Sequence, residues 1–141
     1  LVDSRRTTEV EVGLSDVGFG ISQILPFIVQ SLASEEQVIS IEQPEVHIHP
    51  RLQADLGELL AEATKPPYGH RFLIETHSEH LVLRLQKLIR TKRLRPRDVS
   101  VIYVSRGDEG STVHRLRLDD QGDCIDEWPN GFFPERLREL R

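Results

Sequence analysis

The sequence has 141 residues but no methionine, one cysteine, one tryptophan, and no apolar run long enough to cross a membrane. The single Cys124 excludes an internal disulfide and fits a reducing compartment, so we expect a cytoplasmic protein. The absence of a long apolar run and of a signal peptide excludes a membrane-spanning class. Because the sequence starts at Leu1 and lacks methionine, we expect a fragment or processed form whose N-terminal part is missing.

Composition and charge place the chain among soluble globular domains. Hydrophobic residues make up 38% and charged residues 29%, and the net charge is -5, so no global basic field indicates nucleic acid. A local basic run could still contact DNA phosphates, although such runs are more commonly solvated helix faces. The residues of this run are Arg84, Lys87, Arg90, Lys92, Arg93, Arg95 and Arg97.

Hydrophobic periodicity predicts an α/β fold with a mostly parallel sheet and flanking helices. Short runs rich in β-branched or aromatic residues predict buried strands over 38–41, 72–74 and 99–104, after a short strand over 9–12. Apolar stripes at helical spacing predict helices over 21–32, 52–63 and 81–89. Pro26 fits its helix only near the first turn or at a kink. An edge strand over 113–118 and a tail with a turn and a short helix over 128–141 complete the pattern.

Polar residues follow two of these strands directly. Glu42-Gln43-Pro44-Glu45 ends the first strand, and Glu75-Thr76-His77 ends the second. In parallel sheets ligands gather at the carboxyl ends of the strands. A strand that delivers a carboxylate there resembles the Walker B arrangement, in which the carboxylate holds Mg²⁺. The alternative is an ordinary polar turn.

An earlier segment, 14–23, has small residues before a predicted helix, so its backbone N–H groups can face an anion. Ser15 or Ser22 would add a hydroxyl donor. Taken alone, this segment favours an ordinary turn with a helix cap over an anion site.

In order and spacing, the segments 14–23, 41–50 and 76–78 resemble the ABC-type ATPase head of the OLD/RecF/SMC-like branch. There they are the signature motif, the Walker B motif with its D-loop, and the switch histidine. The resemblance implies a P-loop NTPase-like fold, with 1–105 as the C-terminal part of the ATPase domain and 106–141 as its extension. The ending 128–133 resembles an uncharacterised bacterial branch of predicted ATPases.

The resemblance also implies roles for particular residues. Glu42 takes the place of the Mg²⁺-associated carboxylate, Gln43 that of the catalytic glutamate, and His77 that of the switch histidine. The D-loop around His49 would cross a homodimer interface. The residues implied to contact ATP, partly from the opposite subunit, are Ser15, Gly18, Gly20, Ser22 and His49.

The sequence departs from the family in two ways that affect the mechanism. A carboxamide at Gln43 cannot accept a proton from water, so we expect slow ATP hydrolysis or Glu45 as a substitute base. No Gly-x-x-x-x-Gly-Lys-Ser/Thr loop occurs, so we expect this chain alone to be inactive. The implied activity is that of a slow nucleotide switch, by analogy in DNA repair or phage defence, with an unidentified effector.

Two other interpretations remain open at this stage. His47, His49, His77 and His80 would bind a divalent metal in a metal-dependent hydrolase. Alternatively, a degenerate ATPase fold would serve only as a dimerisation module.

Overall fold

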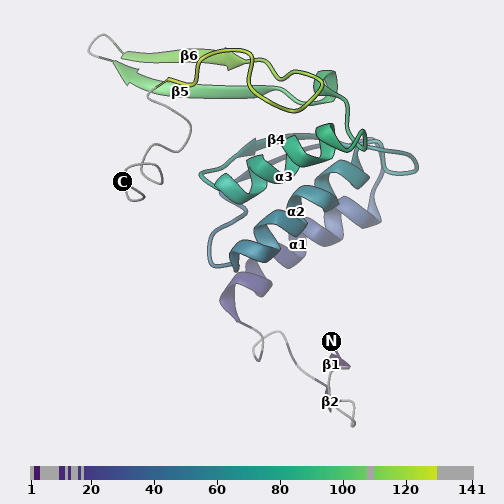
Figure 1. Ribbon diagram of the computed structural model, residues 1–141. Helices are drawn as coiled ribbons and strands as arrows, with labels where there is room; N and C mark the ends of the chain where they lie inside the picture. The colour runs from purple at the N-terminus through teal and green to yellow at the C-terminus, as the bar shows by residue number, and fades with distance from the viewer. Residues whose placement is uncertain are drawn as a thin grey trace.

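The computed structural model describes residues 2–3, 10–11, 13, 16, 18–107 and 110–129 (Figure 1). A short antiparallel pair, β1 (Val2–Asp3) with β2 (Val10–Glu11), precedes the main helices and strands of the chain. They are α1 (Phe19–Ala33), β3 (Val38–Glu42), α2 (Pro50–Ala63), β4 (Arg71–Glu75), α3 (Glu79–Arg90), a 3-10 helix (Pro96–Asp98), β5 (Val101–Gly107) and β6 (Gly110–Leu116). The predicted helices and the four main strands are confirmed, with shifted ends.

Strands β3 and β4 form a parallel pair joined by α2, as a crossover connection requires. The register pairs Val38 with Arg71 and Glu42 with Glu75, so both strands end at the same edge. The segments 43–49 and 76–78, which the sequence singled out, therefore leave the sheet side by side.

All three helices contribute to one core against one face of this pair. Ile39, Ile41, Phe72 and Ile74 point to that face, because side chains alternate along a strand. The buried helix and loop residues that pack there are Ile24, Phe27, Ile48, Leu56, Leu60 and Leu81. The other face is exposed: Val38 is 75% and Leu73 65% accessible. The expectation of a strand buried on both faces is therefore wrong for β3 in this chain.

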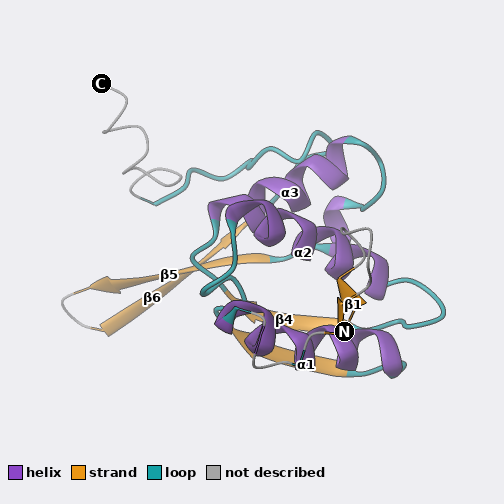
Figure 2. Cartoon of the chain, turned by 90° about the horizontal axis from the view of Figure 1, so that it is seen from below, coloured by secondary structure: helices purple, strands orange, loops and turns teal. Residues whose placement is uncertain are grey.

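The third strand of the predicted parallel sheet is placed elsewhere. Strand β5 pairs with β6, antiparallel, from Val101 with Leu116 to Gly107 with Gly110. Neighbouring strands with a short connection form such hairpins readily. The hairpin extends away from the body of the molecule (Figure 2), and the mostly parallel sheet is reduced to β3 and β4 among the described residues.

A second core lies under the end of α3. It consists of Ala61, Leu88, Ile89, Leu94 and Leu118, with Val101 from β5 packed against it. Trp128 packs edge-on against Tyr103, with 6.0 Å between ring centroids. The predicted turn and helix of the tail, from residue 130 on, lie outside the described residues.

Helix α1 contains its proline in the middle and not in the first turn. Pro26 has no N–H to donate to the carbonyl of Ser22, which normally weakens a helix. Ile24 and Phe27 on either side are buried in the core, so tertiary packing holds this turn in place. Of the two placements that the sequence left open for Pro26, the first turn is therefore wrong, and a kink remains a prediction.

The turn between β3 and α2 packs closely against the start of α1. Gly20 is buried there, and a Cβ on it would overlap the carbonyl group of His47, lying 2.6 Å from its carbon. The His47 ring meets Phe19 edge-on, with centroids 5.3 Å apart. Only glycine allows the two backbones to approach this closely.

We predict that Gly20→Ala destabilises the protein by about 1–3 kcal/mol, because the added methyl must displace backbone and not a flexible side chain. Gly18→Ala is the matched control, since no residue in the described part of the chain lies within 4 Å of a Cβ at Gly18. Chemical denaturation of both variants gives the free energies of unfolding. Equal stabilities for the two variants would show that α1 does not approach the turn.

Candidate functional site

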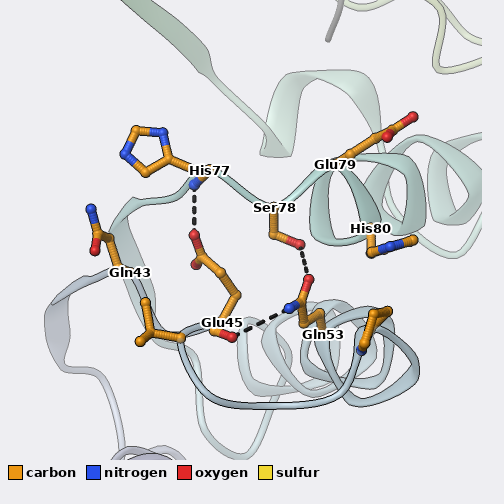
Figure 3. Close-up of a pocket in the computed structure, with 9 residues that line it drawn as sticks. Gln43, Glu45, Gln53, His77, Ser78, Glu79 and His80 are labelled. Atoms are coloured by element: carbon orange, nitrogen blue, oxygen red, sulfur yellow. Dashed lines mark hydrogen bonds between the residues drawn. The ribbon is translucent and has the colours of Figure 1, made fainter. Parts of the chain in front are cut away.

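An open pocket lies where the ends of β3 and β4 meet the starts of α2 and α3 (Figure 3). Its volume is about 510 Å³. The residues that line it come from the two segments singled out by the sequence and from both helices: Gln43, Glu45, Val46, Pro50, Gln53, His77, Ser78, Glu79 and His80. All three residues expected to be catalytic, Gln43, Glu45 and His77, are thus brought together.

Glu45 connects the two segments through both oxygens of its carboxylate. The backbone N–H of His77 donates to Oε1 at 2.6 Å, and the Thr76 hydroxyl donates to Oε2 at 2.7 Å. Glu45 is only 8% exposed. Short hydrogen bonds to a carboxylate are charge-assisted, and they compensate the cost of burying it. In Figure 3 the Glu45 side chain points to the His77 nitrogen, while the imidazole points away from it.

Gln53, in α2, adds a second connection between the same segments. Its amide nitrogen donates to the carbonyl oxygens of Glu45 and Ile48, at 3.3 and 3.1 Å. Its amide oxygen accepts from the Ser78 hydroxyl at 2.7 Å. Ser78 in turn caps α3 by accepting from the N–H of Leu81. The turn after β3 and the start of α3 therefore form one hydrogen-bonded unit.

The backbone at the start of this turn is left-handed at a non-glycine residue. Gln43 has φ 46°, and His47, at the other end of the turn, has φ 64°. Such conformations are uncommon for these residue types and persist where the surroundings over-determine them. The N–H of Gln43 still donates to the carbonyl of Glu75 at 2.8 Å, which fixes the Gln43 backbone at the end of the strand pair.

Glu42 does not line the pocket but lies beside it, on the exposed face of β3. Its register partner is Glu75, and both side chains lie on the same face of the pair. Mg²⁺ is usually bound by one or two carboxylates together with substrate phosphates and water. Two exposed carboxylates at a strand end fit that description, and Glu75 is a residue that the sequence analysis did not assign to magnesium.

The structure describes only part of the segment 14–23, in which the sequence suggested an anion site. Gly18 is the exposed N-cap of α1, and it has no side chain to occupy the first backbone N–H groups. The Ser22 hydroxyl donates to the carbonyl of Phe19 at 2.7 Å, so it is engaged within its own helix. Gly20 is buried against His47. Ser15 lies outside the described residues.

The four histidines of the metal-hydrolase interpretation do not form a cluster. Within the described part of the chain, no group of three or more His, Cys, Asp or Glu side chains is arranged to hold a metal ion. His49 caps α2 by accepting from the N–H of Arg51 through Nδ1, and His47 packs against Phe19. Only His77 and His80 line the pocket. The structure therefore does not bring these four histidines together as one metal site.

Most of the basic run is occupied by partners within the chain. Arg84 and Arg93 both bind Glu58, at 2.8 and 2.6 Å, and Arg93 also binds Glu62. Hydrogen bonds from Lys65 and Arg93 lower the pKa of Glu62, so it stays ionised opposite them. Further pairs join Arg90 to Asp123 and Arg95 to Asp98, while Lys92 donates to a backbone carbonyl. These contacts favour a solvated helix face over a DNA surface.

The sequence did not indicate that Gln53 belongs to the site, and it did not indicate that Thr76 acts as a hydrogen-bond donor there. Gln53 reads as an unremarkable polar position in an amphipathic helix, and no local pattern indicates its partners. Thr76 was noted as part of a motif, but its link to Glu45 spans 31 residues of sequence.

No helix among the described residues is long and apolar enough to cross a membrane.

Comparison with family models gives two matches. Residues 94–141 match a family described as a protein of unknown function (DUF3696). Comparisons with curated proteins and with solved structures find no match. Residues 2–82, more than half of the chain and including the whole pocket, match the model described as AAA ATPase domain. The chain therefore belongs to the AAA ATPase domain family.

Proposed function

We propose that the chain is part of a slow, ATP-dependent switch of the ABC type, in the OLD/RecF/SMC-like branch. In this proposal the pocket beside Gln43 and His77 supplies the catalytic residues of the ATP site. Family membership supports ATP binding and hydrolysis in general terms. The observation that carries the finer proposal is the juxtaposition of Gln43, Glu45 and His77 at the ends of two adjacent parallel strands. In the ATPases that the sequence resembles, these three positions correspond to the catalytic residue, the residue after the Walker B proline, and the switch histidine.

In this proposal ATP is bound with its γ-phosphate facing the pocket. Glu42, with Glu75 next to it, would hold Mg²⁺, which supplies positive charge to the phosphate oxygens. His77 donates a hydrogen bond to the γ-phosphate from its exposed imidazole. The phosphate-binding loop, which this sequence does not contain, must come from another part of the protein.

Gln43 explains why hydrolysis would be slow. Its carboxamide orients the attacking water through a hydrogen bond but cannot take the proton. Loss of a general base costs roughly 10²–10⁴-fold in rate. A long-lived ATP state follows, which suits a switch better than a motor.

The proposal includes a homodimer in which the segment 15–20 of one subunit faces the phosphate bound by the other. Two observations support a contact surface here. Phe19 is 65% exposed at the start of α1, and it packs on His47 in the turn that would form the D-loop. Aromatic side chains, phenylalanine among them, are enriched at protein interfaces relative to the rest of the surface.

We predict that His77→Ala, in the full-length protein, reduces ATP turnover roughly 10²-fold, because the phosphate loses its hydrogen-bond donor. His114→Ala is the matched control, since His114 lies on the β5–β6 hairpin and contacts Ser105. Steady-state phosphate release measures the rate of ATP turnover of both variants. Unchanged turnover for His77→Ala would remove His77 from the mechanism, whereas absence of turnover in the unmodified full-length protein would favour a non-catalytic dimerisation module.

We predict that Gln43→Glu raises turnover, by up to roughly 10²–10⁴-fold, because it supplies the missing base at the same position. Gln121→Glu, in an exposed loop, adds the same charge away from the pocket and should change nothing. Single-turnover measurements isolate the chemical step. A fall in rate for Gln43→Glu would show that orientation of the water, and not its deprotonation, limits hydrolysis.

A further inference from the structure

We infer that Glu45 is a positioning residue for His77 and not a proton acceptor, and that it transmits the state of the turn 43–48 to the imidazole. This inference rests on the proposed function, because it assigns Glu45 a role in the same site. It replaces the role of substitute base that the sequence suggested for the same carboxylate.

The contacts of Glu45 oppose a role as proton acceptor, because both involve the carboxylate as a hydrogen-bond acceptor. Each oxygen already accepts a short hydrogen bond, at 2.6 Å from the His77 N–H and 2.7 Å from the Thr76 hydroxyl. Protonation would weaken both bonds. A general base must also approach the attacking water within about 2.6–3.2 Å. Glu45 is buried and directed to the backbone of β4's end, whereas Gln43 is exposed at the pocket.

The same contacts fix the backbone that carries the imidazole. The carboxylate accepts directly from the His77 backbone N–H. Thr76 extends this link to Ser78, because its Oγ1 accepts from the Ser78 N–H at 3.0 Å. Three successive residues, from Thr76 to Ser78, are thereby tied to one side chain. Gln53 holds the Glu45 carbonyl and the Ser78 hydroxyl at the same time, which prevents the two segments from separating independently.

The turn that carries Glu45 is also the surface on which α1 rests. Gly20 contacts the His47 carbonyl group, and Phe19 contacts the His47 ring. A shift of the α1 start therefore moves the turn, and the turn moves His77 through Glu45. A displacement of about 1 Å at a reacting group can cost 10²-fold in rate. This path connects the segment proposed to meet the partner subunit's ATP with the histidine of the chain's own pocket.

The test is a double-mutant cycle of Glu45 and His77 in the full-length protein, with kcat and KM for ATP hydrolysis as readouts. We expect Glu45→Ala to lower kcat roughly 10²-fold with KM changed less than about threefold. In the His77→Ala background the same substitution should lower kcat less than about twofold further, because Glu45 acts through His77. Glu35→Gln, an exposed carboxylate between α1 and β3, is the neutral control.

Glu45→Gln separates positioning from base catalysis, and it serves if Glu45→Ala does not fold. Its amide oxygen accepts from the His77 N–H and its amide nitrogen donates to the Thr76 oxygen, so we expect kcat within about fivefold of the unmodified protein. A loss of roughly 10²–10⁴-fold would identify Glu45 as the base and overturn the inference. Additive effects in the cycle would also overturn it while leaving the proposed function intact. If His77→Ala alone has no effect, the proposed function and this inference fail together.

Discussion

The arrangement of the candidate site depends on the buried carboxylate of Glu45. This carboxylate accepts hydrogen bonds from Thr76 and His77, which lie 31 and 32 residues further along the chain. Removing an ionised group from water is costly, so Glu45 is stable at this position only while both donors remain in place. Each charge-assisted hydrogen bond is worth roughly 1.5–3 kcal/mol. The carboxylate therefore couples the turn after β3 to the end of β4 more tightly than backbone pairing alone, which ends at Gln43 and Glu75.

Other features of the fold depend on this junction. The left-handed conformations at Gln43 and His47 bring the turn back toward β4, and the close contact at Gly20 holds α1 against it. Below the junction the three helices cover one face of β3 and β4, while Val38 and Leu73 remain exposed on the other. Parallel strands in complete domains are usually covered on both faces. The pocket thus lies at the edge of a sheet with one open face.

The helices, the main strands and the placement of the two polar clusters were predictable, because periodicity and the rules for parallel crossovers are local. Ser78 and Pro50 could be assigned to helix starts for the same reason. The pairing of β5 with β6 was not predictable, since an apolar run fits either kind of sheet. The four histidines suggested a metal site, and only their contacts, such as His49 capping α2, exclude it. Glu45 was recognised as important but given another role, because sequence does not show that both its oxygens are engaged.

Hydrogen exchange at the backbone amide of His77 tests the central interaction most directly. The account predicts that this amide is protected, although it lies beyond the end of β4, and that Glu45→Ala accelerates its exchange roughly 10–100-fold. The amide of Arg71, bonded to Gln37 at the other end of β4, should be unaffected. Exchange of His77 at the rate of an unstructured chain, or protection that survives Glu45→Ala, would contradict the account.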